Sequence, residues 1–266
     1  MLNKYGVEMI RKIIKKIGVK TSVYFLYTAK PNILNPIFYL RKSHERKARR
    51  KIKEVDQGAL YKFLNEVIEK SNSTGCEYSD YLRIWNELHE YQPKNILECG
   101  SGVSSVVFAY YIFKLKDPLS VNFISMEEND HYHSQIKNIF PEELKGFVTF
   151  CISERVESVY NGILGCHYKE VPDLKYDYIF IDAPTLRNFK DKSYPKAFNS
   201  DVINMILRYP EHPINGILDQ RIDTLRALKK LIPAGDIKYL VTEKMSTLRG
   251  IRSDQLVKSL QINQSL

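Results

Sequence analysis

Along most of the chain, short apolar runs alternate with segments in which apolar residues recur at helical spacing. From about Asp56 onward, the runs predict strands and the periodic segments predict helices. The predicted strands cover residues 94–100, 121–127, 146–153, 176–184, 214–220, 237–245 and 246–253. The predicted helices cover residues 57–70, 78–92, 104–115, 130–140, 200–209 and 223–232. We expect residues 154–175 to form a long irregular connection.

Strands that alternate with helices indicate right-handed crossovers and an α/β fold. The pattern therefore predicts a doubly wound, mostly parallel sheet of seven strands, in which the last two strands form a hairpin. A chain of 266 residues with 44% hydrophobic residues is long and apolar enough for one large domain of this kind. In such sheets, ligands bind beyond the carboxyl ends of the strands.

The first part of the chain differs from the rest in charge. Residues 1–54 contain fifteen Lys/Arg and three Asp/Glu, a balance of +12, whereas the remaining residues carry −3 of the total of +9. Apolar residues at helical spacing alternate with basic ones between Val7 and Ile17, and a second basic run spans residues 41–53. We predict a basic amphipathic helical extension over residues 1–55 and an α/β domain over residues 56–266.

Three interpretations of this extension stay open. Its apolar stripe can dock on the protein's own core, with the charges facing water. It can instead lie on an anionic membrane surface, where each basic residue adds about 1 kcal/mol. Nucleic acid is the third partner class. It is disfavoured because the aromatic residues between Tyr24 and Tyr39 lie in apolar runs and not on a base-stacking platform.

The cysteines and the N-terminal segment bear on the compartment. Cys76, Cys99, Cys151 and Cys166 have no CxxC spacing, so neither a zinc site nor a disulfide framework is expected. The start of the chain is too charged for a secretory signal, and its longest apolar stretch is broken by Lys30-Pro31. We predict a cytoplasmic protein, with peripheral attachment at the inner face of a membrane as a further option.

The segment "NILECGSGVSSV", residues 95–106, joins a predicted strand to a predicted helix. Gly100 and Gly102 lie in the turn, where glycine tolerates positive φ and lets a ligand approach the backbone. Glu98 precedes them at the strand end and suits a cationic group. A dinucleotide pyrophosphate would be poorly matched to that carboxylate, whereas a zwitterionic amino acid carrying a sulfonium would fit it better.

With "LECGSGVSS", the chain resembles the class I S-adenosylmethionine (SAM)-dependent methyltransferases over about residues 75–253. The resemblance implies a Rossmann-like domain that binds SAM. It implies that Glu98 holds the amino group of the methionine moiety through the loop formed by Gly100, Ser101 and Gly102. Two positions depart from the family pattern, Cys99 between acid and glycine and Ser104 in place of a third glycine.

Two further strand ends extend the resemblance to the rest of the cofactor. An acid that ends the second strand binds the ribose hydroxyls in this family, and Glu127 stands there with Glu128 next to it. Residues after the third strand usually touch the adenine, and Ser153 and Glu154 occupy that place. Asp182 ends the fourth strand, beside the expected position of the cofactor.

The acceptor site is expected between the fourth and fifth strand ends. Asp182 and Asp219 would face each other there, and with Gln220 they make an oxygen-rich Mg²⁺ site. This arrangement is loosely similar to catechol-type O-methyltransferases, in which asparagine stands at the position of Gln220. A metal-free general base at either aspartate is the rival, and Asp219 can equally cap the next helix.

Other side chains near the acceptor are weaker candidates. His167 can act as a base, and Arg187 and Arg221 can bind an acidic acceptor, although solvated surface positions are the default for all three. Nucleobase N-methylation is disfavoured. Enzymes that resemble the adenine amino-methyltransferases carry an Asp/Asn-Pro-Pro-aromatic motif after the fourth strand, whereas Asp182-Ala183-Pro184-Thr185 has one proline and no aromatic residue.

The sequence thus predicts a SAM-dependent methyltransferase that O-methylates a small molecule or a glycan. The alternatives are an RNA methyltransferase that uses the basic extension for phosphate contacts, and a catalytically inactive membrane-associated binding module. The acceptor itself has no readable code, because acceptor sites of this kind are built from loops.

Overall fold

The computed structural model describes residues 36–71, 77–184 and 197–264. The predicted helix around Val7–Ile17, Cys76 and Arg187 lie outside these residues. No described helix is long and apolar enough to cross a membrane.

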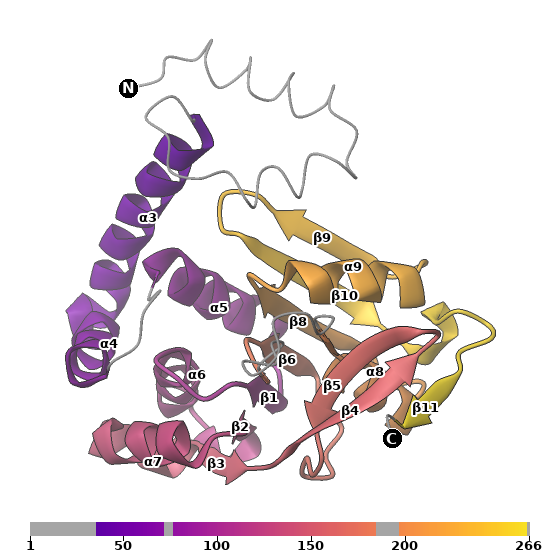
Figure 1. The fold of residues 1–266 in the computed structure, drawn as a ribbon. Helices are drawn as coiled ribbons and strands as arrows, with labels where there is room; N and C mark the ends of the chain where they lie inside the picture. Colours follow the sequence, from indigo (N-terminus) through magenta and orange to yellow (C-terminus); the bar gives the residue numbers. More distant parts are fainter. Residues whose placement is uncertain (1–35, 72–76, 185–196, 265–266) are drawn as a thin grey trace.

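Seven strands form the central sheet, in the order β3-β2-β1-β6-β8-β10-β9 (Figure 1). All neighbours are parallel except β10, which runs antiparallel to both β8 and β9. The strands are β1 (Asn95–Cys99), β2 (Asn122–Glu127), β3 (Thr149–Ile152), β6 (Tyr178–Ile181), β8 (Ile214–Asp219), β9 (Asp236–Leu240) and β10 (Met245–Ile251). The predicted doubly wound, mostly parallel sheet is confirmed.

Helices cover both faces of this sheet, and the strands alternate their side chains between two apolar cores. Ile96 faces one core and Leu97 the other; Phe180 and Ile179 do the same. The first core lies under the helices between α3 and α7, the second under α8 and α9. The helices are α3 (Pro36–Glu54), α4 (Ala59–Lys70), α5 (Tyr78–Tyr91), α6 (Ser104–Phe113), α7 (Asp130–Ile139), α8 (Asp201–Arg208) and α9 (Ile222–Leu231), with single 3₁₀ turns at Val55–Gly58, Pro118–Ser120, Glu142–Phe147 and Ser253–Gln255.

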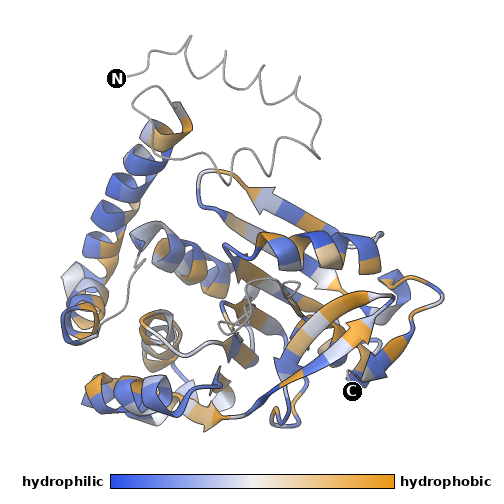
Figure 2. Ribbon diagram, viewed as in Figure 1, coloured by the Kyte–Doolittle hydropathy of each residue, from blue (hydrophilic) through white to orange (hydrophobic). Residues whose placement is uncertain are grey.

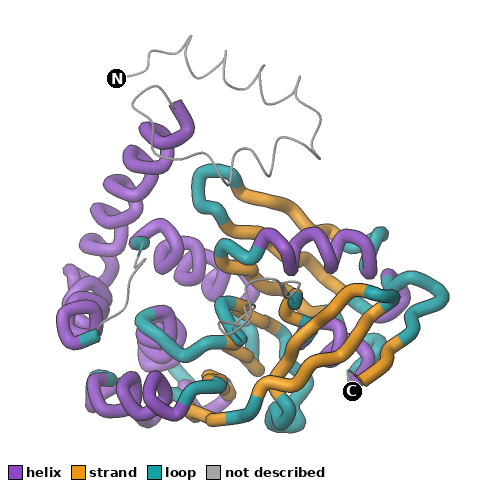
Figure 3. Tube along the Cα trace, viewed as in Figure 1, coloured by secondary structure: helices purple, strands orange, loops and turns teal. Residues whose placement is uncertain are grey.

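The expected irregular connection after β3 is wrong. Residues Arg155–Tyr160 and Ile163–Tyr168 form an antiparallel hairpin, β4–β5 (Figure 3). Asn161 and Gly162 at its tip both have positive φ (48° and 76°), as a two-residue type I′ turn requires. The C-terminal strand β11 (Ile262–Gln264) and β7 (Phe198–Asn199) extend the hairpin into a second, four-stranded sheet.

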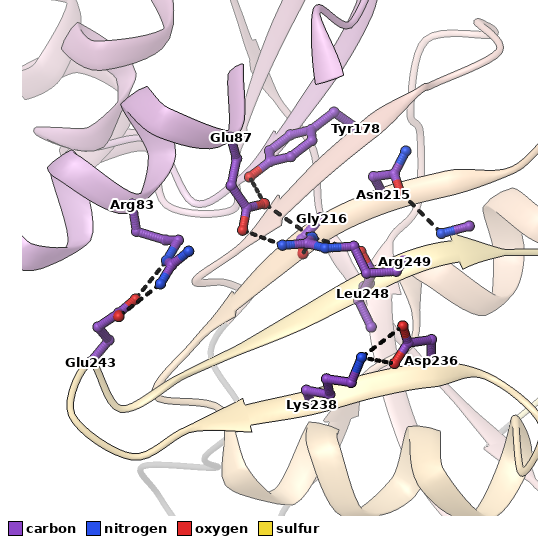
Figure 4. A network of polar contacts seen from close by, with 11 residues as sticks. Arg83, Glu87, Tyr178, Asn215, Gly216, Asp236, Lys238, Glu243, Leu248 and Arg249 are labelled. Carbon is purple, nitrogen blue, oxygen red and sulfur yellow. Dashed lines mark hydrogen bonds and ion pairs between the residues drawn. The ribbon is translucent and has the colours of Figure 1, made fainter. Parts of the chain in front are cut away.

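Buried polar contacts fasten α5 to β10 and to the turn before it (Figure 4). The Arg83 guanidinium donates two hydrogen bonds to the Glu243 carboxylate, at 2.6 and 2.8 Å. Glu87, fully buried, accepts from Arg249 at 3.1 Å and from the Tyr178 hydroxyl at 3.0 Å. Because a buried charge that lost its partner would be costly, these pairs fix the position of α5 against the sheet. This places the N-terminus of α5 beside the carboxyl end of β8.

Candidate active site

The glycine loop follows β1 at the carboxyl edge of the sheet. Gly100 has a φ of +104°, and a Cβ at this position would lie 2.7 Å from the Ala183 Cβ. Only glycine therefore fits where the loop passes the end of β6. A Cβ at Gly102, by contrast, would meet nothing closer than the Ser104 hydroxyl at 4.0 Å, so space remains there for a ligand.

Glu98 is fully buried beneath this loop and accepts three hydroxyl hydrogen bonds. Ser104 donates to one carboxylate oxygen at 2.6 Å, while Ser105 and Ser125 donate to the other at 2.5 and 2.6 Å. Burial raises the pKa of Glu98 to about 7, although the three hydroxyls oppose this shift. Glu98 thus ties the start of α6 to β2 and gives the loop its shape, which agrees with a role exerted through the loop.

Glu127 and Glu128 lie next to the loop, at the end of β2. One Glu127 oxygen accepts the backbone N–H groups of Glu128 and Asn129, both at 3.0 Å. Burial, followed by the neighbouring Glu128 charge, raises the pKa of Glu127 to about 7. Glu128 accepts a hydrogen bond from the Tyr168 hydroxyl at 3.3 Å, which links it to the hairpin. Two adjacent carboxylates suit two vicinal hydroxyl groups.

The two residues after β3 have different surroundings. The Ser153 hydroxyl is buried and accepts the Glu170 N–H at 2.9 Å, so it holds the return of the hairpin. Glu154 is exposed and pairs with Lys169 at 3.2 Å. Their contacts to an adenine ring stay predictions.

An ion pair between Asp182 and Arg221 links the ends of β6 and β8, where the acceptor site is predicted. Arg221 Nη2 lies 2.8 Å from Asp182 Oδ1, and the Asp182 side chain is half exposed. The predicted Arg221 therefore comes from the loop after β8 and reaches across to the end of β6. Arg221 also precedes α9 directly, so Asp219 is not the N-cap residue of that helix.

Asp219, two residues earlier, is partly buried and differs from Asp182 in its partners. Its Oδ1 atom is buried and has no hydrogen-bond partner in the described part of the chain. Burial, followed by the charge of Asp182, raises the pKa of Asp219 to about 8. An acceptor oxygen that is buried without a donor is costly, so this atom is suited to a donor supplied by a ligand.

Asp80 is a residue that the sequence did not single out. It lies in the first turn of α5, is only 6% exposed, and its pKa is raised well above the ordinary value by burial and then by Asp219. An ion pair between Glu77 and Lys244, 2.6 Å apart, lies beside the two aspartates. This edge thus holds two ion pairs and two further carboxyl groups.

The predicted Mg²⁺ site does not fit this arrangement. The guanidinium of Arg221 already occupies an Asp182 oxygen, so a cation at this position would have to displace it. Gln220 follows Asp219 directly, in a left-handed conformation with a φ of 44°. We derive no step through a metal.

His167 lies in β5 and not in an irregular loop. Its Nδ1 atom is 3.3 Å from the Ser200 hydroxyl, and burial lowers its pKa, which favours the neutral imidazole. A neutral ring is the form that accepts a proton, so a catalytic His167 stays a prediction.

Solved structures with a similar fold are methyltransferases. A proposed caffeoyl-CoA O-methyltransferase from Staphylococcus aureus matches with a TM-score of 0.50 and 18% identity, over 75% of this chain and 96% of that one. The chain has the class I SAM-dependent methyltransferase fold.

Two other structures match less well. A proposed O-methyltransferase from Klebsiella pneumoniae has a TM-score of 0.46 at 14% identity, covering 79% of this chain and 99% of that one. The SAH-bound methyltransferase PaMTH1 from Podospora anserina has a TM-score of 0.44 at 13% identity, covering 94% of this chain and 97% of that one. No protein-family model matches the chain, and neither does any curated protein sequence.

Proposed function

We propose that this protein is a SAM-dependent methyltransferase that O-methylates a small molecule. The observation that carries the proposal is the buried acid at the end of β2 beside the glycine loop. Glu127 is 6% exposed and ends β2, the strand next to β1. The glycine loop follows β1, is held by the hydrogen bond from Ser104 to Glu98, and leaves space for a ligand at Gly102. A ligand site beyond the carboxyl ends of the strands, as is usual in open α/β sheets, supports this assignment.

The side chains present fit such a cofactor. Glu127 and Glu128 would accept the ribose hydroxyls, and the loop from Gly100 to Gly102 would face the methionine moiety. When bound, SAM supplies a methyl group on a sulfonium, open to in-line attack by the acceptor oxygen. The chain's own task is then to align that oxygen and to receive its proton.

Asp219 is the proposed proton acceptor. Its Oδ1 atom has no protein partner in the described residues, and a pKa of about 8 gives the carboxylate the basicity to take a proton from a hydroxyl. Burial raises the pKa of Asp182, and Arg221 opposes this shift through the ion pair that also holds the loop after β8. Asp182, Arg221 and His167 act in this proposal as acceptor-site residues, without a metal.

The unpaired oxygen of Asp219 also bears on the acceptor class. Its Oδ1 atom lacks a donor within the described residues, and a hydroxyl group of the acceptor would supply one, whereas ionised phosphate oxygens only accept. This favours a polyhydroxyl acceptor such as a glycan over the phosphate backbone of RNA. A cytoplasmic location belongs to the same proposal.

Calorimetric titration with SAM and its demethylated product tests the proposal. Glu127→Ala should weaken binding by about 1.5–3 kcal/mol, because the ribose loses charged hydrogen-bond acceptors. Glu143→Ala, a change of the same type at an exposed position, is the matched control and should bind as the wild type does. If the wild type binds neither compound, the protein is not a SAM-dependent enzyme.

A further inference from the structure

The outward face of α3 is a continuous basic surface. Its seven exposed basic residues are Lys42, Arg46, Lys47, Arg49, Arg50, Lys51 and Lys53. Lys42, Arg46, Arg50 and Lys53 recur every three or four residues and so follow one stripe, about 17 Å long at 1.5 Å per residue. Figure 2 shows α3 as a largely hydrophilic helix at the edge of the molecule.

The opposite face of α3 is anchored, so the basic face has to point outward. Ala48 and Ile52 are buried in the first core. Glu45 accepts the N–H groups of Tyr78 and Ser79, both at 2.8 Å, which caps α5. Arg41 donates to the Val241 carbonyl at 3.1 Å. The helix therefore cannot rotate to bring its cations to the protein's own acids.

This concentration of charge is not compensated by acids within the described ranges. Within the described part of the chain, none of the seven basic side chains forms an ion pair with an acid. Like charges four residues apart, such as Arg46 and Arg50, repel each other on a helix. An external polyanion would relieve that repulsion and is the complementary partner.

The aromatic rings near this face favour a lipid surface over nucleic acid. Lys42 lies over the Phe38 ring at 4.5 Å, and Lys53 over the Tyr61 ring at 4.6 Å. Arg49 lies 5.3 Å from the Tyr78 ring. Rings covered in this way do not offer a stacking platform for bases. Tyr39, 46% exposed at the start of the stripe, is the type of residue found at membrane interfaces.

We propose that the outward face of α3 docks the protein on an anionic lipid surface. The asymmetry of the chain supports one orientation, because residues 1–54 carry +12 and the remainder −3. Through Glu45, the docked helix connects directly to the N-terminus of α5, where Asp80 lies. The inference does not depend on catalysis and stands even if the proposed methyl transfer is wrong.

Cosedimentation of the full chain with vesicles of phosphatidylcholine, with and without phosphatidylserine, tests this inference. We expect binding only to the anionic vesicles, weakened by added salt. The triple variant Arg46→Glu, Lys47→Glu, Arg50→Glu removes three cations, each contributing about fivefold, so affinity should fall by at least about 100-fold. SAM affinity and the circular dichroism of this variant should stay unchanged if the fold is intact.

The matched control carries the same charge change on α9, in Arg226→Glu, Lys229→Glu, Lys230→Glu, three exposed positions. It should keep most of its vesicle binding. Equal losses in the two variants would overturn the inference, because net charge alone would then explain binding. Absence of wild-type binding to anionic vesicles, or α3-dependent binding to RNA that exceeds vesicle binding, would also overturn it.

Discussion

Glu98 and Asp219 lie at the carboxyl edge of the same sheet, and burial raises the pKa of both. Their hydrogen bonds differ completely. Glu98 accepts three hydroxyl groups within 2.6 Å, whereas Asp219 Oδ1 accepts none from the described chain. The first carboxylate holds the glycine loop in shape, and the second leaves an oxygen without a donor at the proposed acceptor site. Two similar carboxylates thus divide structural and chemical roles according to what surrounds them.

The difference follows from the neighbouring residue types. Three serines around Glu98 have hydroxyls that rotate to meet a carboxylate, so the burial cost is partly offset. Around Asp219, burial and then the charge of Asp182 raise the cost of ionising the carboxyl group, and Asp80 lies within electrostatic reach. Sites that keep an uncompensated group of this kind are commonly functional.

The largest effect is expected when the satisfied acid is removed. Glu98→Ala should lower the free energy of unfolding by about 3 kcal/mol or more, since it leaves a cavity and buried serine hydroxyls without their acceptor. Urea unfolding followed by circular dichroism measures this. Glu154→Ala, at an exposed position, should change stability by less than about 0.5 kcal/mol. A Glu98→Ala variant as stable as the wild type would show that the serine contacts contribute nothing net.

Removing the charge of Asp219, whose Oδ1 atom has no donor in the described residues, should instead raise the free energy of unfolding. With a folded pKa of about 8, above the unfolded value of about 3.9, Asp219 contributes stability that is present below the unfolded pKa and lost as pH rises through 8. Asp219→Asn lacks this loss. We expect the variant to gain about 1–2 kcal/mol over the wild type between about pH 6.5 and about pH 8.

Asp182→Asn is the control for that measurement, because Asp182 already has Arg221 as its partner. This change should destabilise the protein slightly, by about 1 kcal/mol or less, since the pair is partly exposed. Thermal melts at both pH values separate the two variants. A destabilised Asp219→Asn at every pH would mean that Asp219 has a partner after all.

The strand ends of this site were predictable because local pattern sets them. The acid, the two glycines and the next acid lie on consecutive elements, and parallel strands bring their carboxyl ends together. Asp80 was not predictable, because only the packing of α5 brings it within electrostatic reach of a residue 139 positions later. The serine contacts of Glu98 had a signal in the sequence, because Ser125 is a polar residue inside an otherwise apolar strand.

The sequence contains a local signal for the β4–β5 hairpin, which the predicted irregular connection overlooks. Asn161-Gly162 is flanked by β-branched and aromatic residues, the strongest short-range mark of a two-residue hairpin. The ion pair between Arg221 and Asp182 could not be predicted, for a different reason. A salt bridge between two loops depends on side-chain reach across the sheet, which neither periodicity nor turn chemistry specifies.

The smallest effect is expected at Glu127, which belongs to the cofactor end but resembles Asp219 in its raised pKa of about 7. An ionised carboxylate accepts ribose hydroxyls more strongly than a protonated one, by about 1 kcal/mol. SAM affinity of the wild type should therefore rise roughly threefold to fivefold as pH passes from about 6 to about 8. Glu127→Gln should bind more weakly and with a flat profile over this range. If the variant keeps the wild-type pH dependence, another group titrates, and Glu128, which shares the strand end and contacts Tyr168, is the first to substitute.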